Sequence, residues 1–378
     1  MQRIIPMDEY LNHQIAETFA TVGESDNAWT EKIWCSLFAK DGSLQIDAGL
    51  GKYHNRNVMD GFAGASQGKR QLTVRASRRL DNAPDLLGVG PIVYEIVEPL
   101  TSARFSLAPN EQVPLSFDLT MTRVLPPFLE NPDRQRDPFA LRVSSDLLRY
   151  HQACTVSGWI RIEDEEIEVR DEEWAGFRDH SWGVRMDVGS PAADVFQVDR
   201  LAGNFVLQWS PMVLFPGDGG APYEFHHYLQ SVDEVTTYFS GYINHADGRQ
   251  EPVRDLRDDL RYDRRTRRLL GGTVTLDMGW GETRTIEIEP VSDTGFHLGT
   301  ANYFGHKGKA HGVWLGDEHQ DGEIYSDMTE PETLRAAHQL RDCVIRVREE
   351  NAEGFGIFES MVIGEHARYG LDRAGSFL

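Results

Sequence analysis

The stretch GGTVTLDMGWGETRTIEIEP, residues 271–290, shows the pattern that decides the fold. Apolar and polar side chains alternate in its first half, where threonine separates Val274 from Leu276, and again in its second half around Ile286 and Ile288. Alternation with a period of two puts one apolar face on each segment, and the Gly-Trp-Gly sequence between them suits a tight turn. We therefore predict a β-hairpin here.

The same pattern recurs along the chain. Residues 158–170, GWIRIEDEEIEVR, predict a hairpin with an acidic turn, and residues 342–366 predict a last hairpin. The segment RQLTVRASRRL, residues 70–80, places three apolar side chains on one face: Leu72, Val74 and Ala76. Helical patterns are confined to the first thirty residues and to EPETLRAAHQL, residues 330–340. Many short strands with frequent turns favour antiparallel sandwiches or barrels over βαβ units.

The length and the charge limit the organisation and the partners. A chain of 378 residues exceeds one ordinary core, so we expect two domains, at residues 1–175 and 176–378, divided after an acidic run. Sixty Asp and Glu against 38 Lys and Arg give a net charge of -22. This field repels nucleic acid and anionic membranes, so neither is an expected partner.

The cysteines and the N-terminus indicate the compartment. Cys35, Cys154 and Cys343 are far apart and match no metal-binding spacing, which predicts reduced thiols in a cytoplasmic protein. No segment has the apolar length of a signal peptide or approaches the roughly 18 residues of a membrane span, so we expect no stable membrane insertion. A homodimer is a possible assembly.

Familiar catalytic signatures are missing from the sequence. It contains no phosphate-binding Gly-x-x-x-x-Gly-Lys-Ser/Thr, no His-Glu-x-x-His and no dinucleotide-type Gly-x-Gly-x-x-Gly after a strand. Nucleotidases, zincins and Rossmann oxidoreductases are therefore disfavoured. We expect no cofactor and no bound metal.

The stretch GFRDHSWGVR, residues 176–185, is the densest in chemically capable side chains. If it is a strand, Asp179 lies on one face, and the other face carries Arg178, His180 and Trp182. A carboxyl beside an apolar cavity would have a raised pKa and could act as a general acid, while a tryptophan could stabilise a developing cation. The alternative is a structural clasp, in which buried charged groups fix two barrels against each other.

The five residues Asp179-His180-Ser181-Trp182-Gly183 resemble the Asp-His-x-Trp-Gly signature of the AttH-like and carotenoid hydratase superfamily. Segments such as DNAWTEKIW, residues 26–34, are similar to those of its uncharacterised bacterial members. The resemblance implies an all-β chain of two lipocalin-like, calycin-type antiparallel β-barrels with a few short helices. It also implies an apolar ligand, isoprenoid or polycyclic, because characterised members include hydratases and cyclases. Only Asp179, His180 and Trp182 carry over as motif positions.

Two further segments contain histidines. NYFGHKGKAHGVWLGDEHQDGEIY, residues 302–325, has His306 and His311 five positions apart, so in one strand they would face opposite sides and would not share a metal, although turns at the intervening glycines could change this. Three of its side chains are candidates for lining a pocket: Tyr303, His311 and Trp314. In YEFHHYLQ, residues 223–230, one of two adjacent histidines should point inward if the strand lines a barrel.

These observations lead to one functional hypothesis and one alternative. We expect a cofactor-independent enzyme that acts on a small apolar substrate (terpenoid, steroid or polycyclic aromatic), as a hydratase or dehydratase or as an acid–base cyclase or isomerase. Asp179 would be the general acid or base and His180 its partner. The expected substrate contacts are Trp182, Arg178, Tyr303, His311 and Trp314. The alternative is a non-catalytic protein that binds an apolar ligand.

Overall fold

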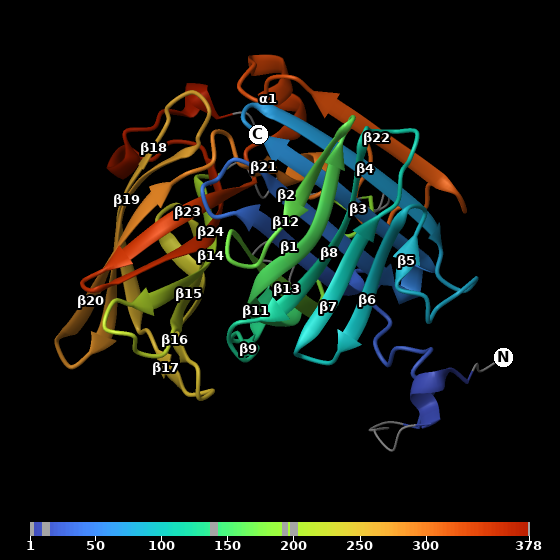
Figure 1. Ribbon diagram of the computed structural model, residues 1–378, viewed down its shortest axis with the longest axis horizontal. Coiled ribbons are helices and arrows are strands. Elements are labelled where there is room, and N and C mark those ends of the chain that lie inside the picture. The colour runs from blue at the N-terminus through green and yellow to red at the C-terminus, as the bar shows by residue number, and fades with distance from the viewer. Residues whose placement is uncertain (1–3, 10–15, 137–142, 191–195, 197–202, 377–378) are drawn as a thin grey trace.

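The computed structural model describes residues 4–9, 16–136, 143–190, 196 and 203–376. Within these residues, 14 strands form one curled antiparallel sheet and ten form a second. Figure 1 shows the two sheets side by side, with the second sheet at the left of the view. About 7% of the described residues are helical. The predicted all-β class is therefore confirmed, and the two-part architecture implied by the resemblance is present as two half-barrels.

The first sheet contains the motif strand at its centre. Its main path is β22 (His319–Tyr325), β4 (Arg70–Arg79), β3 (Val58–Gln67), β2 (Gln45–Tyr53), β1 (Trp29–Ala39), β13 (Trp174–Val184), β11 (Val143–Ile162), β8 (Leu115–Arg123), β7 (Ser102–Leu107), β6 (Ile92–Glu98) and β5 (Gly88–Val89). Three short strands also pair with β11: β9 (Phe128–Leu129), β10 (Asp133–Arg136) and β12 (Glu165–Val169).

The second sheet is built from later parts of the chain. Its main path is β17 (Gln250–Pro252), β16 (Val235–His245), β15 (Tyr223–Val232), β14 (Phe205–Pro216), β24 (Ala352–Ile363), β23 (Arg341–Glu349), β20 (Glu282–Pro290), β19 (Leu269–Gly279) and β18 (Asp255–Tyr262). Strand β21 (Phe296–His297) pairs with β23. The helical segments are α1 (Pro331–Ala337) and the 3-10 turns η1 (Pro6–Glu9), η2 (His54–Arg56), η3 (Leu298–Ala301), η4 (Ala367–Tyr369) and η5 (Arg373–Gly375).

The predicted hairpins form. Strands β19 and β20 pair with Val274 opposite Ile286, and the Gly-Trp-Gly turn joins them with Trp280 at a positive φ of 56°. The hairpin of β11 and β12 and the last hairpin of β23 and β24 are also present, as is the short helix α1. Of the helical pattern in the first thirty residues, residues 10–15 lie outside the described part, and η1 is the described helical turn.

The sheets divide the chain differently from its order in sequence. Strand β13 spans the predicted boundary at residue 175, and it pairs with β1 and β11 in the middle of the first sheet. Strand β22 comes from residues 319–325 and returns to pair with β4 at the edge of the same sheet. The two halves are thus linked by exchanged strands, and the boundary between domains remains a prediction.

Alternation along the strands creates three apolar cores. The first lies in the curl of the first sheet and includes Leu72, Val74 and Ala76, as predicted. The second lies in the curl of the second sheet and includes Val274 and Ile286. A third core lies between the sheets and is rich in aromatic rings: Trp34, Phe38, Phe62, Phe128, Phe177, Trp209, Tyr228 and Phe296. The candidate functional residues lie in this third core, where polar side chains are inserted among the aromatic rings.

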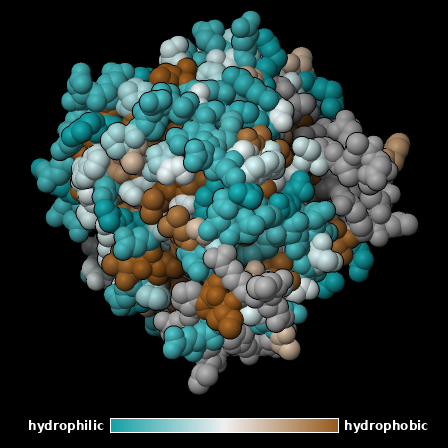
Figure 2. Space-filling model, turned by 90° about the vertical axis from the view of Figure 1, so that its right-hand side faces the viewer, coloured by the Kyte–Doolittle hydropathy of each residue, from teal (hydrophilic) through white to brown (hydrophobic). Residues whose placement is uncertain are grey.

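The surface is charged and polar. Figure 2 shows a face that is mostly hydrophilic, with apolar residues in separate patches, as expected for a chain with a net charge of -22. Among the described helices, none is both long enough and apolar enough to span a membrane.

Candidate active site in a charged layer between the sheets

Strand β13 presents the Asp-His-Ser-Trp-Gly motif with the predicted alternation. Phe177 faces the second sheet and stacks on Phe38, with 6.4 Å between ring centroids. Arg178 faces the opposite way, into the curl of the first sheet, and its Nε donates to the Gln152 side chain at 3.0 Å. Asp179 is therefore directed into the space between the two sheets.

His180 and Trp182 lie on the other side of this strand from Asp179. His180 Nε2 is 3.0 Å from a carboxylate oxygen of Glu31, and its ring makes edge contacts with Trp182 and Tyr150. Because the sheet backbone separates them, the structure does not bring His180 to Asp179 as a partner. Arg178, His180 and Trp182 instead share the inner face of the first sheet.

Asp179 is buried, with 9% of its surface exposed. Its carboxylate lies 3.1 Å from Arg149 Nε, and its neighbours in register on the adjacent strands are Trp34 and His151. Burial raises the pKa of Asp179, although the positive charges of Arg149 and Arg185 oppose that rise. The raised pKa is what sequence reasoning required of a general acid, whereas the apolar cavity of that expectation is not formed by either described cleft.

The second sheet presents its own carboxyl to the same space. Glu359 on β24 lies between Asp342 on β23 and Trp209 on β14 in the strand register. Burial raises the pKa of Glu359 to about 7, with Arg149 opposing the rise and the charge of Asp179 adding to it. Glu359 is only half-buried by surface area, so its side chain retains accessible surface.

We call this inter-sheet set of titratable residues the charged layer. It comprises Lys32, Asp47, Glu130, Arg149, His151 and Asp179 from the first half, and Glu224, His226, Asp342 and Glu359 from the second. Its rings include Trp34 and Trp209, which meet edge to face with 5.2 Å between centroids. Charged groups are seldom buried unless they are paired, so this concentration in one layer marks a functional candidate.

One part of the layer is a pair of carboxyls that joins the halves. Burial raises the pKa of Asp342 well above its usual value, and the neighbouring charges of Glu359 and Asp47 add to that rise. Burial also raises the pKa of Asp47 to about 7, and Ser36, Asp342 and Gln45 oppose that rise. The Gln45 amide donates to Asp47 at 3.0 Å and to the Asp342 carbonyl at 3.2 Å.

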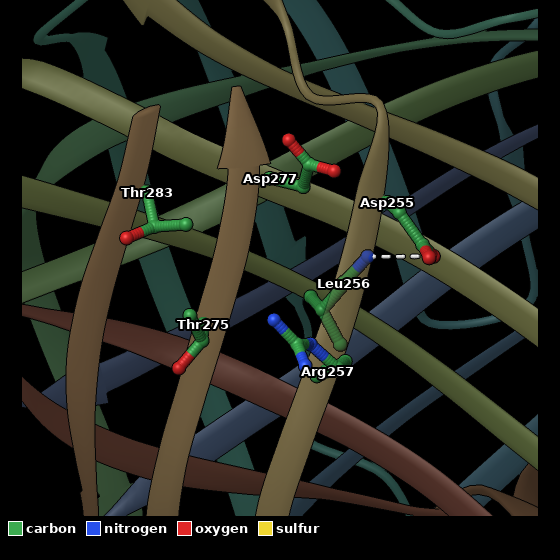
Figure 3. Close-up of a pocket in the computed structure, with 6 residues that line it drawn as sticks. All are labelled: Asp255, Leu256, Arg257, Thr275, Asp277 and Thr283. Atoms are coloured by element: carbon green, nitrogen blue, oxygen red, sulfur yellow. Dashed lines mark hydrogen bonds between the residues drawn. The ribbon is translucent and has the colours of Figure 1, made fainter. Parts of the chain in front are cut away.

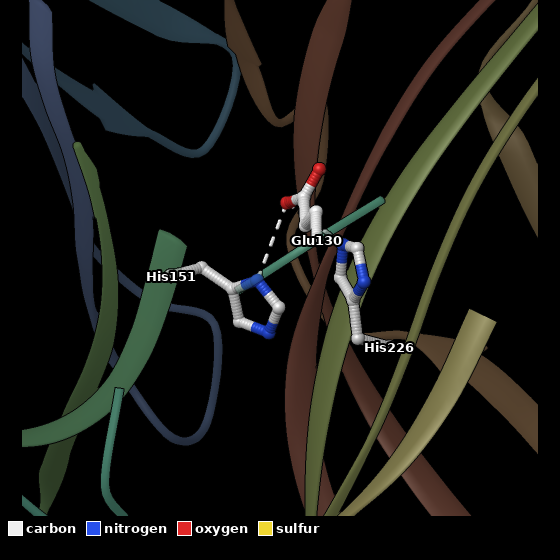
Figure 4. Close-up of side chains that lie close together, drawn as sticks. All are labelled: Glu130, His151 and His226. Carbon is white, nitrogen blue, oxygen red and sulfur yellow. Dashed lines mark hydrogen bonds and ion pairs between the residues drawn. The ribbon is translucent and has the colours of Figure 1, made fainter. Parts of the chain in front are cut away.

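A second part is a cluster around His151, shown in Figure 4. His151 Nδ1 lies 3.2 Å from Glu130, and its Nε2 lies 2.5 Å from Glu224. Burial alone would lower the pKa of His151, but the two carboxylates raise it to about 9. His226 stacks beside His151 with 4.0 Å between ring centroids. Glu130, His151 and His226 form a set that could hold a metal ion.

A third part surrounds Lys32. Its Nζ lies 2.9 Å from His311 Nε2 and 3.7 Å from the centroid of the Tyr303 ring. Burial lowers the pKa of Lys32 well below its usual value. Burial also lowers the pKa of His311 to about 4. Tyr303 and His311, both predicted to line a pocket, thus meet at one end of the charged layer beside a lysine that sequence reasoning did not select.

Trp314, the remaining predicted pocket residue, lies at the surface with 48% of its area exposed. It borders a cleft of about 420 Å³ that begins beside His311 and is lined by Asn27, Asn55, Arg56, Val58, Ser190, Gly312, Val313 and Trp314. A second cleft, of about 280 Å³, lies on β18, β19 and β20, and Figure 3 shows its lining of Asp255, Leu256, Arg257, Thr275, Asp277 and Thr283. Neither cleft includes Asp179 in its lining.

The other histidines of residues 302–325 do not converge. His306 pairs with Glu323 at 3.0 Å, and His319 pairs with Asp321 at 3.3 Å. His306 and His311 lie among turns and not in one strand, so strand alternation does not apply to them, and they contact different partners: Glu323 and Lys32 respectively. In YEFHHYLQ the two histidines face opposite sides as expected: His226 points to the first half, whereas His227 stacks on Phe225 within the second core.

A family model and several solved structures match this chain. Residues 4–372 match the model of a family of unknown function, DUF8625. The chain belongs to this family. No curated protein matches the chain in sequence.

Solved structures similar to this member of DUF8625 share little sequence with it. CghA bound to Sch210972 is 9% identical, with 96% of this chain and 94% of that chain covered at a TM-score of 0.48. Kievitone hydratase from Nectria haematococca is 10% identical, with 88% of each chain covered at a TM-score of 0.40. At these levels we draw no conclusion about the reaction from either structure.

Several residues of the layer in this DUF8625 protein are not signalled by any catalytic motif. Glu130 lies in a Pro-rich loop segment, and Asp342 and Glu359 are acidic residues beside apolar runs in hairpin strands. The available signal was polar alternation: every second residue of YEFHHYLQ is polar and faces the same way, and Arg149 and His151 share one face of β11. A strand with apolar residues on one face and titratable ones on the other usually indicates a solvated face, so the pattern alone did not mark a buried site.

The glycine of the motif has a structural role that can be tested. Gly183 adopts φ +129°, and a Cβ there would lie 2.1 Å from the carbonyl oxygen of Asp146 on β11. We expect Gly183→Ala to lower the free energy of unfolding by about 1–3 kcal/mol, because the backbone is strained for any other residue. Thermal and denaturant unfolding measure this. Gly203→Ala, whose new Cβ would meet no atom closer than 3.3 Å, should change stability by less than half as much.

Proposed function

We propose that this protein is an enzyme that performs acid–base chemistry on a small apolar substrate in the charged layer, as a hydratase or dehydratase or as a cyclase or isomerase. The supporting observation is the buried carboxyl of Asp179, which has a raised pKa and lies among aromatic rings. Glu359 from the facing sheet supplies a second protonatable carboxyl with accessible surface. A carboxyl whose pKa is raised by burial holds its proton to a higher pH than an exposed one and is better suited to proton donation.

The proposed reaction begins with proton transfer from the Asp179 carboxyl to one carbon of a carbon–carbon double bond. The adjacent carbon becomes a cation, and the rings of Trp34 and Trp209 stabilise it through their π faces. In hydration, a water oxygen adds to the cation and loses a proton to a base, which restores the charge balance. In isomerisation or cyclisation, the cation instead reacts internally and loses a proton from carbon.

The base in this scheme comes from the same layer. Burial lowers the pKa of Lys32, so its amine is more easily neutral than a surface lysine, and it adjoins His311 and Tyr303. Tyr303 is half-buried and retains accessible surface. Proton transfers of this kind consume no redox equivalents, so the proposal requires neither nicotinamide nor flavin. A cytoplasmic location and a possible homodimer remain predictions.

A second candidate is a non-catalytic protein that binds an apolar ligand and uses the layer as a clasp. The observation that favours it is Arg149, which contacts Glu130 at 3.1 Å and Asp179 at 3.1 Å and so joins two acidic groups. Ion pairs of this type between packed sheets can be structural only.

A screen decides between turnover and binding. The protein is incubated with a panel of terpenoid, steroid and aromatic alkenes in heavy-oxygen water, and the products are identified by mass. Incorporation of one oxygen atom from water indicates hydration, and a changed retention time at constant mass indicates isomerisation or cyclisation. Ligands that bind but return unchanged across the whole panel would favour the clasp.

A further inference from the structure

The cluster of Figure 4 has a feature that acid–base chemistry at Asp179 does not use. His226 is fully buried, at 0% exposure, and neither of its ring nitrogens has a hydrogen-bond partner among the described residues. Buried polar atoms are normally satisfied, and a buried imidazole without a partner requires an explanation such as an ion.

We propose that Glu130, His151 and His226 bind a divalent transition-metal ion of the zinc class between the two sheets, with Glu224 orienting His151. The three ligand atoms already converge. One oxygen of Glu130 lies 3.2 Å from His151 Nδ1 and 3.3 Å from His226 Nε2, and all three ligand atoms lie within 4.8 Å of one another. Ligand atoms around a tetrahedral zinc ion are about 3.3 Å apart, given zinc–nitrogen and zinc–oxygen bonds of about 2.0–2.1 Å.

The surroundings supply the outer contacts that such a site needs. Metal-binding histidines usually donate their second ring nitrogen to a carboxylate, and His151 Nε2 does so to Glu224 at 2.5 Å. Glu224 is held in turn by the Asn244 amide at 3.2 Å. This chain fixes the orientation of the His151 ring, so that Nδ1 points towards Glu130.

The carboxylate of Glu130 is also held by its neighbours. Arg149 binds its Oε2 at 3.1 Å, and the indole N–H of Trp209 donates to its Oε1 at 2.9 Å. The Arg149 contact occupies the oxygen that faces away from the imidazoles and leaves Oε1 as the ligand. Two carboxylates, Glu130 and Glu224, face one guanidinium, Arg149, so a cation that takes the place of the His151 proton meets a net negative charge.

The donor set identifies the class of ion. Two imidazoles and one carboxylate suit zinc and related first-row divalent metals, whereas magnesium and calcium prefer oxygen ligands. Three protein ligands leave at least one coordination position free, as in sites where a metal holds water or substrate. The proposed ligands come from both halves: Glu130 and His151 from the first and His226 from the second. None of them takes part in the proposed acid–base steps, so the metal site is an additional function.

Metal content and cobalt spectroscopy test this site in the full chain. The protein is treated with a chelator, dialysed and titrated with Co²⁺, and zinc content after reconstitution with Zn²⁺ is measured by mass spectrometry. We expect one zinc per chain and visible d–d absorption that saturates at one Co²⁺. A folded chain that binds less than about a tenth of an equivalent of either metal would overturn the proposal, whatever the variants do.

Variants locate the bound metal. His226→Ala should weaken Co²⁺ binding at least 100-fold and abolish the stoichiometric absorption. His227→Ala is the matched control, because it removes an equally buried neighbouring histidine that faces the second core, and it should keep the spectrum. Glu224→Gln should weaken binding about 10–100-fold without changing the ligand count, as expected of a positioning residue. Retention of parental binding by a folded His226→Ala protein would rule out this site.

Discussion

Asp179→Asn should reduce turnover about 100-fold or more on any substrate that the screen identifies. The change keeps the size of the side chain and its hydrogen-bonding reach but removes the proton that the proposed reaction transfers, and general acids contribute on this scale. Initial rates at saturating substrate measure the effect. Affinity for an apolar fluorescent ligand should change little, because the amide still fills the same position between Trp34 and Arg149.

The clasp hypothesis predicts the opposite result for this variant. If Asp179 serves mainly to neutralise Arg149, its removal leaves a buried charge poorly paired and costs about 3–5 kcal/mol of stability. Asp317→Asn is the control, because Asp317 also pairs with an arginine, Arg79, at 2.8 Å, but at the surface. A variant of Asp179 that melts well below the parent, while its folded fraction turns over at the parental rate, would rule out the catalytic role.

The carboxyl pair of Asp47 and Asp342 should make stability fall as the pH rises. In the folded protein the pKa of Asp47 is raised to about 7 and that of Asp342 well above its usual value, whereas the unfolded values are about 3.9. From about pH 4 to about pH 7 the folded state therefore keeps protons that the unfolded state has lost. The stabilisation is full below pH 4 and is lost at about 1.4 kcal/mol per pH unit for each such group.

The double variant Asp47→Asn/Asp342→Asn isolates this effect, since amides do not titrate. Between pH 5 and pH 7 the parent should lose about 3 kcal/mol or more of unfolding free energy relative to the variant. Denaturant unfolding at each pH measures the difference in unfolding free energy between the two proteins. The titration of groups that both proteins contain, such as Glu359 and the buried histidines, largely cancels in this difference. Asp41→Asn is the control: hydrogen bonds from Ser43 lower the pKa of Asp41, so it is ionised in both states and its curve should run parallel to the parent. Parallel curves for the double variant would show that the pair is ionised in the folded protein.

Much of the fold could be predicted from local pattern alone. The period-two alternation around Val274 and Ile286 predicted the hairpin of β19 and β20, because each strand must bury one face whatever it packs against. The same reasoning placed Asp179 and His180 on opposite sides of β13. The resemblance of the motif implied two β-barrel halves, and the structure has two curled sheets.

The contacts between the halves could not be predicted in this way. Nothing in the spacing of Glu130, His151 and His226 shows that they converge. Glu130 lies in a loop, His151 on a central strand of the first sheet and His226 on a strand of the second. For the same reason, the expectation of no bound metal did not take this donor set into account, because it relied on the spacing of residues within single segments. Lys32 beside His311 is a further example, because 279 positions separate them in sequence.

The sequence by itself determined the strands, their turns and the face on which each side chain lies, because these depend on residues a few positions apart. It also determined the negative charge and the candidate acid at Asp179. Only the tertiary structure decided which faces meet. The polar face of β11 and β13 packs against that of β14, β15 and β24, and the titratable groups between the sheets are removed from water. This desolvation raises the pKa of Asp179 and Glu359 and lowers that of Lys32. Burial of a charge is a property of two surfaces together, so neither strand alone could indicate it.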